Sequence, residues 1–174
     1  PITVTVTGPF SNSELELIYN DSGELDNDPP YGGCSTVAVH KDRLWVGGGD
    51  EADVLWYSKE RADGRSAEFA FGQQVRVAGQ EVVALASLDD ALVVLCKNGV
   101  YAIYGDGPNA TGDAASGFFQ VVPISTSVGC LSPAVAVIPK GVIFQAPSGM
   151  MLLNRGRALE PMPHVPTSAT ARPV

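Results

Sequence analysis

The fold of this 174-residue chain is decided by the stretch VVALASLDDALVVL, residues 82–95. Two apolar runs flank a polar pair, Asp89-Asp90, where a chain in strand conformation must reverse. A third run, GVYAIY at residues 99–104, follows directly on Asn98. The Asn98-Gly99 dipeptide suits a tight hairpin, because glycine accepts a positive φ at little cost. The stretch therefore predicts consecutive antiparallel strands joined by short turns.

The same pattern of strand, turn, strand, turn and strand occurs on both sides of this stretch. It is found at residues 35–47 with 54–58, and at residues 133–144 with 149–153. Aligning Leu44, Leu92 and Val142 gives repeats that lie 48 and 50 residues apart. Repeats of about 40–50 residues with several strands each are typical of β-propeller blades. We expect a fourth strand at residues 69–77 in the first unit and at residues 118–122 in the second.

The nearly continuous apolar runs at residues 92–95 and 142–144 predict strands that are covered on both sides. A single small sheet cannot bury both of its faces, but sheets stacked face to face can. A propeller usually needs at least four blades. We therefore expect either an excerpt of a longer chain or a ring that other segments close.

The fold class predicted is all-β, a partial propeller of antiparallel blades with a short N-terminal β-hairpin module. Residues 1–30 form the hairpin, with strands at 2–7 and 15–19, and a linker rich in Asp, Asn, Gly and Pro. Residues 31–158 form the blades in three repeat units, and residues 159–174 form a Pro-rich linker or arm. The chain starts without Met or a signal peptide, so a cut or processed product is expected.

The composition excludes several classes of protein. Lys and Arg number 11 against 19 Asp and Glu, giving a net charge of −8, and no basic cluster is present. A sequence-specific nucleic-acid binder needs a basic surface. No apolar run reaches the ~18 residues of a membrane span. The cysteines (Cys34, Cys96 and Cys130) are odd in number and form no CxxC pair, so buried structural thiols are expected rather than disulfides or zinc.

No combination of residues predicts catalysis. His40 and His164 lack a metal-spaced partner; His40 is expected at a strand–turn junction on the surface, and His164 in the exposed tail or at an interface. Residues 47–49 are three glycines followed by carboxylates, which repel phosphate, so they predict a hairpin turn. Asp89 and Asp90 should be solvated in their turn rather than paired for glycoside chemistry. We therefore predict a non-enzymatic chain without cofactor, metal or catalytic residues.

Two groups of residues leave an alternative open. Asp106, Asn109 and Asp113 could supply oxygen ligands to Ca²⁺, although their spacing is not that of an EF-hand. A polar surface loop over residues 105–113 is the preferred interpretation. The aromatic residues Trp45, Trp56 and Tyr57 could form a platform for sugar stacking, but packing inside or between the blades is preferred.

Several stretches resemble the propeller region of structural proteins in tailed bacteriophages and prophages. They are residues 39–48, 56–59, 68–69, 85–90, 105–109, 128–130, 141–145 and 149–156. The proteins in question belong to tails or head–tail connections, and the nozzle protein of short-tailed phages is the best-understood relative in kind. The shared motifs are turn and packing signatures, so the resemblance carries over no catalytic residue.

The resemblance implies a ring-forming component of the virion that surrounds the DNA exit channel in several identical copies. Its partners would be those copies and other tail or portal-adaptor proteins, with DNA passing only as cargo and no membrane involved. An acidic channel wall would repel DNA and let it slide. One alternative is a carbohydrate-binding propeller that contacts host glycans, which predicts Trp45 or Trp56 exposed beside polar groups. Another is a propeller hydrolase, which predicts carboxyl groups within about 10 Å in a cleft.

Overall fold

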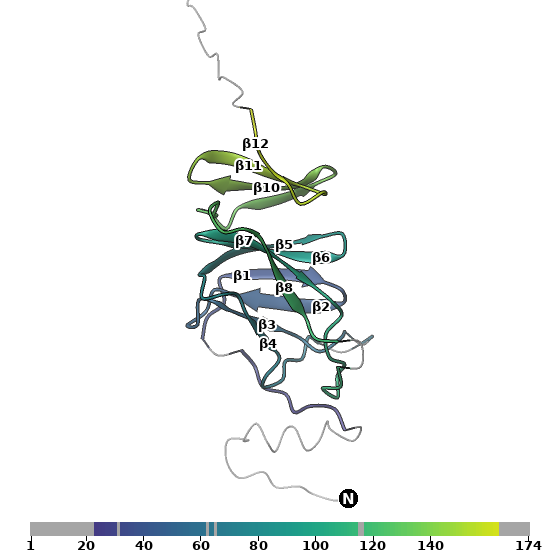
Figure 1. Ribbon diagram of the computed structural model, residues 1–174. Coiled ribbons are helices and arrows are strands. Elements are labelled where there is room, and N and C mark those ends of the chain that lie inside the picture. The colour runs from purple at the N-terminus through teal and green to yellow at the C-terminus, as the bar shows by residue number, and fades with distance from the viewer. Residues whose placement is uncertain (1–22, 31, 62, 65, 115–116, 164–174) are drawn as a thin grey trace, which may run out of the picture.

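Three four-stranded antiparallel sheets follow one another along the chain (Figure 1). The computed structural model describes residues 23–30, 32–61, 63–64, 66–114 and 117–163, and within these ranges every helix or strand assigned is a strand. The all-β prediction is therefore confirmed. The expected strands at 2–7 and 15–19 lie outside the described residues, as do residues 164–174.

Each sheet contains its strands in chain order, as a simple meander. The first sheet consists of β1 (Thr36–His40), β2 (Arg43–Gly47), β3 (Val54–Tyr57) and β4 (Gln74–Arg76). The second consists of β5 (Val82–Leu88), β6 (Ala91–Cys96), β7 (Gly99–Tyr104) and β8 (Gln120–Ser125). The third consists of β9 (Val135–Ile138), β10 (Gly141–Ala146), β11 (Gly149–Asn154) and β12 (Leu159–Pro161). All the strand triplets predicted from the sequence are therefore present.

Several of the predicted reversals have the positive φ that tight hairpins favour, but Gly99 at the Asn98-Gly99 reversal does not. Lys41 and Asp42 both have positive φ, 48° and 54°, which matches the two central residues of a type I′ turn. Asp89 at 54° and Gly149 at 119° also have positive φ at the equivalent and following reversals. The tips pair His40 with Arg43 in the first sheet and Leu88 with Ala91 in the second.

The fourth strands differ from the sequence prediction in their bounds. β4 begins only at Gln74, because Gly72 with a φ of +83° interrupts the extended chain; before it, Ala70 makes an isolated bridge to Asn27. β8 runs to Ser125 rather than ending at residue 122. β12 lies within residues 159–174, where the sequence predicted a linker, so the third repeat extends beyond residue 158.

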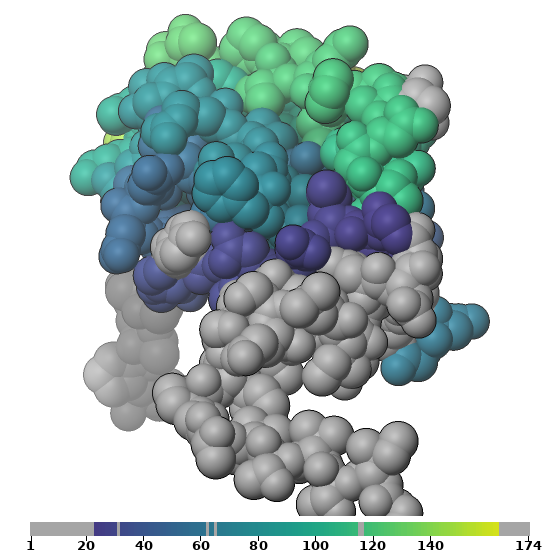
Figure 2. All heavy atoms as spheres, turned by 90° about the horizontal axis from the view of Figure 1, so that it is seen from below, coloured from purple at the N-terminus to yellow at the C-terminus, as the bar shows by residue number. Residues whose placement is uncertain are grey.

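The described part of the predicted linker, residues 23–30, lies against the rest of the molecule. The Leu25 amide donates to the Ala110 carbonyl at 2.9 Å, and Lys59 Nζ donates to Asn27 Oδ1 at 2.8 Å. Figure 2 shows this purple segment beside green residues of the second repeat. These residues are therefore hydrogen-bonded to the rest of the described chain rather than separate from it.

Each strand has two faces, and the register is the same in the three repeats. Ala38 pairs with Trp45, Ala86 with Val93, and Ala136 with Ile143. We call the side of each sheet that carries Trp45, Val93 or Ile143 its forward face. The opposite side, which carries Leu44, Leu92 or Val142, is its backward face, since successive side chains alternate along a strand.

The forward face of each sheet packs against the backward face of the next. The first core joins the first and second sheets and contains Trp45, Leu55, Tyr57, Val77, Val82, Leu85, Leu92, Val94, Cys96, Tyr101 and Ile103. The second core joins the second and third sheets and contains Ala84, Ala86, Leu88, Val93, Leu95, Val100, Cys130, Val142, Phe144, Ala146, Met151 and Leu153. The middle sheet is thus covered on both faces, as the sequence predicted for residues 92–95.

The same prediction is wrong for residues 142–144. Val142 and Phe144 are fully buried, but Ile143 between them is only half-buried. Its side chain lies on the forward face of the third sheet, beyond which no further described sheet follows. β1 lies beside β5 and β5 beside β9, so the first strands of the sheets are neighbours (Figure 1). The described residues include no helix that could cross a membrane.

Candidate functional site

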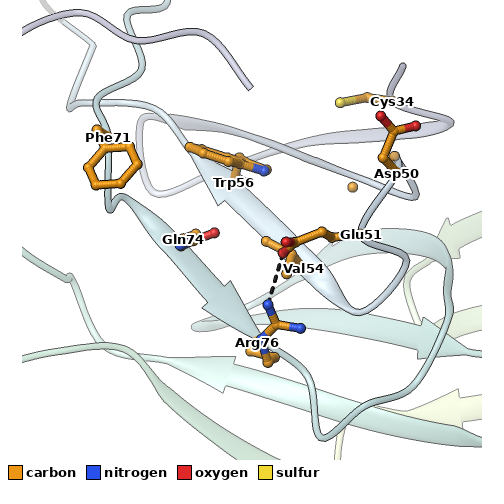
Figure 3. A pocket seen from close by; sticks show the side chains of 10 residues that line it. Cys34, Asp50, Glu51, Val54, Trp56, Phe71, Gln74 and Arg76 are labelled. Atoms are coloured by element: carbon orange, nitrogen blue, oxygen red, sulfur yellow. Dashed lines mark hydrogen bonds and ion pairs between the residues drawn. The ribbon is translucent and has the colours of Figure 1, made fainter. Parts of the chain in front are cut away.

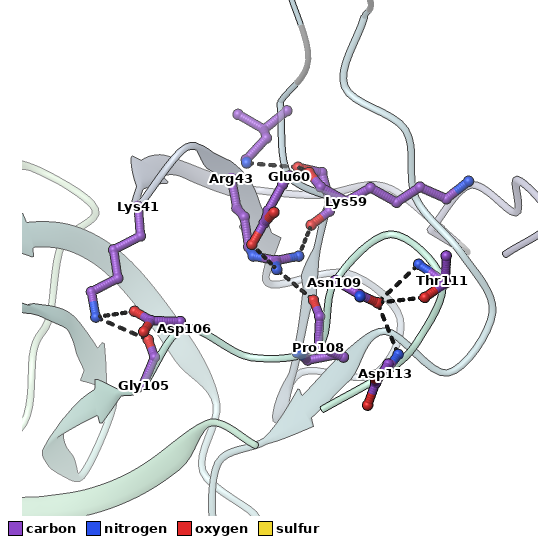
Figure 4. A network of polar contacts seen from close by, with 12 residues as sticks. Lys41, Arg43, Lys59, Glu60, Gly105, Asp106, Pro108, Asn109, Thr111 and Asp113 are labelled. Atoms are coloured by element: carbon purple, nitrogen blue, oxygen red, sulfur yellow. Dashed lines mark hydrogen bonds and ion pairs between the residues drawn. The ribbon is translucent and has the colours of Figure 1, made fainter. Parts of the chain in front are cut away.

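A buried arginine fastens the first sheet to the second. Arg43 is the first residue of β2 and its side chain is 1% exposed. Its Nη1 donates to the Ser58 carbonyl at 3.0 Å, while Nη2 donates to the Pro108 carbonyl and to Glu60 Oε1 at 3.1 Å (Figure 4). Burial lowers the pKa of Arg43, and the Glu60 carboxylate opposes that shift. The guanidinium thus holds the loop at residues 105–113 from within the first sheet.

The loop at residues 105–113 uses its own oxygens for these and similar contacts. Asp106 Oδ1 accepts from Lys41 Nζ at 2.7 Å, and this pairing lowers the pKa of Asp106. Asn109 Oδ1 accepts from the Thr111 amide at 3.1 Å, the Thr111 hydroxyl at 2.7 Å and the Asp113 amide at 2.9 Å (Figure 4). Within the described residues no cluster of three or more His, Cys, Asp or Glu side chains could hold a metal. Asn109 Oδ1 is therefore occupied by hydrogen bonds within the loop.

The second and third sheets are fastened by ion pairs at the surface. Asp89 and Asp90, in the turn between β5 and β6, pair with Arg155 and Arg157 respectively, the latter at 2.9 Å. Both arginines lie between β11 and β12. The sequence predicted solvated carboxylates in this turn; both are exposed, and they are also ion-paired across the stack. We call the contact between two neighbouring sheets a seam. In both seams, the turn between the first two strands of one sheet contacts the loop between the last two strands of the next sheet.

His40 is buried, whereas the sequence predicted a surface position. It is the last residue of β1, at the predicted strand–turn junction, but the second sheet covers it and leaves it 4% exposed. Its Nδ1 lies 2.8 Å from the Ser87 hydroxyl. Burial lowers the pKa of His40, and the positive charge of Lys41 lowers it further. His164 lies outside the described residues.

The aromatic residues divide between packing and surface. Trp45 and Tyr57 are buried and contact the Phe119 ring, with centroids 4.7 and 4.8 Å away, so the packing interpretation is confirmed for both. Trp56 points the other way, onto the backward face of the first sheet, where it is half-buried. Together with Phe71 and other residues it lines an open pocket of about 210 Å³ (Figure 3).

The rim of this pocket is polar. Arg76 donates to Glu51 at 2.9 Å and to Asp53 at 2.7 Å, and Gln74 lies beside Trp56 (Figure 3). Residues 47–49, which the sequence predicted as a hairpin turn, form the end of β2 and the start of its connection to β3. The pocket therefore combines the aromatic residues Trp56 and Phe71 with a rim in which Arg76 and Glu51 are paired.

The cysteines do not share one environment. Cys96 and Cys130 are buried, and burial together with the neighbouring Cys130 raises the pKa of Cys96 to about 12. Cys34 is exposed, so the prediction of a buried thiol is wrong there. Cys34 precedes β1 and lines the same pocket as Trp56, outside both cores.

Two apolar faces lie at opposite ends of the stack. On the backward face of the first sheet, Val37 and Val39 are 62% and 65% exposed. On the forward face of the third sheet, Met150 is 49% exposed and Ala136 is also exposed. Half-buried apolar residues continue these faces, namely Leu44, Val46 and Trp56 on the first and Ile138, Ile143 and Leu152 on the third. These two surfaces, which we call the open faces, are the most distinctive candidates for function.

No protein-family model matches the chain, and no curated protein is significantly similar to it. The site must therefore be interpreted from its own residues. Sequence analysis missed Arg43, although a signal exists: the equivalent first positions of β6 and β10 carry the small residues Ala91 and Gly141. A large cation at a position where the repeats otherwise carry small residues indicates a special contact.

Proposed function

We propose that the chain is a non-enzymatic structural component of a tailed-bacteriophage virion, a ring-forming tail or nozzle protein around the DNA exit channel. The observation that carries this proposal is the pair of open faces, which are apolar at both ends of one stack. Apolar surfaces of this kind mark sites of association with other protein. The resemblance of residues 39–48 and 141–156 to phage tail and head–tail proteins supplies the setting.

In this proposal the sheets are successive blades of a propeller. A blade is a four-stranded antiparallel meander, and blades stand around a centre with their first strands innermost. The order of strands in every described sheet and the neighbouring positions of β1, β5 and β9 agree with that arrangement. The partners would be copies of the chain and other tail or portal-adaptor proteins. The net charge of −8 suits a wall past which DNA moves without binding.

The test uses phage particles purified from the cell whose genome encodes the chain. An antibody raised against residues 32–61 would be used on gradient-purified particles, by immunoblot and by gold labelling in electron micrographs. We expect the chain to co-sediment with intact particles and the gold to lie at the tail. The proposal fails if the chain is abundant in the lysate but absent from washed particles. Antibody absorbed with the purified chain is the control.

A second function, contact with host surface glycans, is favoured by the half-buried Trp56 beside Gln74. A sugar ring can stack on an indole while polar neighbours bind its hydroxyls. Titration of the chain with surface oligosaccharides should then change its tryptophan fluorescence, and Trp56→Ala should abolish the change. A glycoside hydrolase is less compatible with this pocket, because Glu51, one of its two lining carboxylates, accepts a hydrogen bond from Arg76.

A further inference from the structure

We propose that the open face of the first sheet binds the open face of the third sheet in a second copy of this chain, head to tail. The contact would repeat the packing that already joins the sheets within one copy. This inference names the partner for the assembly proposed above and rests on that proposal. It is carried by residues whose equivalents in the other repeats are buried or partly buried.

Met150 indicates that the open face of the third sheet lacks a covering sheet. It pairs with Gln145, as Val100 pairs with Leu95 and Leu55 with Gly47, so Met150, Val100 and Leu55 are equivalent. Leu55 and Val100 are fully buried by the sheet that follows each of them, whereas Met150 is 49% exposed. A further sheet placed by the same rule would cover Met150.

Val37 gives the matching observation on the first sheet. It pairs with Val46, as Leu85 pairs with Val94, so the two are equivalent positions of β1 and β5. Leu85 is 5% exposed in the first core, whereas Val37 is 62% exposed. A preceding sheet placed by the same rule would cover Val37.

Trp56 extends this match to the pocket. It pairs with Val46, as Tyr101 pairs with Val94 and Met151 with Phe144. Tyr101 and Met151 are both buried in the cores between sheets. The position that carries Trp56 is thus an interface position in the other repeats, which favours protein over sugar as its occupant.

Charged residues at the edge of the proposed contact, which we call the contact rim, point to the same partner. Within one copy, Lys41 in the turn between β1 and β2 pairs with Asp106 at 2.7 Å. Asp90 in the turn between β5 and β6 pairs with Arg157 at 2.9 Å. The third such turn carries Lys140, which is exposed. By the same rule Lys140 would meet the loop between β3 and β4 of a second copy, which carries the exposed Glu60 and Asp63 beside Arg61.

A second copy is the occupant because one chain presents both halves of the contact. The halves are different surfaces, so the association is heterologous: it leaves one open face at each end and extends to a ring if the rotation closes. Gln145 adds a polar group to the open face of the third sheet, at the position that Leu95 occupies in the second. Asn154 and Glu160 also lie on that face and are hydrogen-bonded to each other at 2.6 Å, while its other residues are apolar.

Two single-ended variants test the proposal, Val37→Glu and Met150→Glu, with Phe118→Glu as the matched control. Phe118 is an apolar residue outside both open faces that is even more exposed, at 74%, than the two test residues. Light scattering coupled to size-exclusion chromatography would give the mass of the 1–174 chain over a range of concentrations. We expect wild type and Phe118→Glu to form larger species as concentration rises. Each single-ended variant alone should stay monomeric at concentrations where wild type is oligomeric.

An equimolar mixture of the two variants is the decisive sample. Each variant still has one intact open face, so the mixture should form dimers and nothing larger. A wild-type chain that stays monomeric at all concentrations would overturn the proposal, since other segments would then cover the faces. Dimers of Val37→Glu alone would also overturn it, because the third sheets would be pairing with each other. Circular dichroism checks folding, and Leu44→Glu, at a position whose equivalents Leu92 and Val142 are fully buried, with Ala136→Glu replaces any variant that fails it.

The proposed contact of Lys140 with the loop between β3 and β4 is tested separately by charge reversal. Lys140→Glu should weaken the association at low salt by about 2- to 5-fold, within the range of exposed ion pairs. Adding Asp63→Lys should restore it, and a double variant no tighter than the single one would contradict the assigned rim contact. Particle location and oligomer formation are independent readouts. A chain absent from virions could still assemble head to tail, and a virion protein could still be monomeric in solution.

Discussion

The middle sheet and the third sheet share one strand order and one register, yet they differ in burial. Every residue of β6 is buried, whereas in β10 Ile143 is half-buried and Gln145 is exposed. The middle sheet has a neighbour on each face, and the third has a described neighbour only on its backward face. Burial in this molecule therefore depends on a sheet's place in the stack as much as on its own residues.

Matched truncations at equivalent positions should show the largest effect. Leu92 is fully buried in the first core, while its equivalent Leu44 is half-buried on an open face. Leu92→Ala should lower the free energy of unfolding by about 2–5 kcal/mol, because it leaves a cavity between two sheets. Leu44→Ala should cost less than about 1 kcal/mol. Denaturant unfolding of dilute, monomeric protein gives both values.

Similar losses at Leu44 and Leu92 would contradict the comparison, because they would mean that the open face is covered in the monomer. The denaturant slope provides a control. It should be the same for both variants, since neither changes the surface exposed on unfolding.

Substitutions in the buried seam between the first two sheets should lower the free energy of unfolding more than substitutions in the exposed seam between the last two. Arg43→Met removes the donor for the Ser58 and Pro108 carbonyls, which should cost about 1–3 kcal/mol. Arg43→Lys should recover little of this loss, since an ammonium cannot reproduce the guanidinium fork. Hydrogen exchange of amides at 105–113 should also accelerate in Arg43→Met. Unchanged exchange there would mean that Arg43 does not hold the loop.

The buried seam should also respond to pH through His40. The pKa of His40 is lowered in the folded chain, so the unfolded chain binds more protons as pH falls below the ordinary value of about 6.5. The stability contributed by neutral His40 is complete above that pH and is lost as pH falls through it. Urea midpoints between pH 5 and pH 8 should therefore fall on acidification in wild type, and less steeply in His40→Gln.

Lys41→Met sharpens this test. Removing the nearby positive charge should raise the folded pKa of His40 and so reduce the loss of stability in acid. If the loss of stability in acid is identical in wild type and His40→Gln, groups other than His40 cause it.

The smallest effect is expected at the exposed seam. A double-mutant cycle on Asp89 and Arg155, using Asp89→Ala and Arg155→Ala, should give a coupling of about 0.2–1 kcal/mol that weakens with added salt. A coupling as large as the loss at Arg43 would remove the distinction between the seams. The pair Asp90 and Arg157 serves as an internal repeat of the measurement.

The sequence predicted what depends on neighbours along the chain. The strand alternation and the turn at Lys41-Asp42 were sufficient to place the triplets of strands. It did not predict what depends on another sheet. His40 is buried because the second sheet covers it, and Arg43 is buried by a loop some sixty residues further along the chain. The open faces are also a property of the stack, so no local pattern identifies them.

Hydrogen–deuterium exchange at low and high protein concentration tests the central claim, that one packing rule joins the sheets and leaves two open faces. At low concentration β6 should exchange most slowly, because both of its faces are covered. Raising the concentration should slow exchange in β1–β3 and in β9–β11, while β6 stays unchanged. Protection that is independent of concentration in both end sheets would contradict this account.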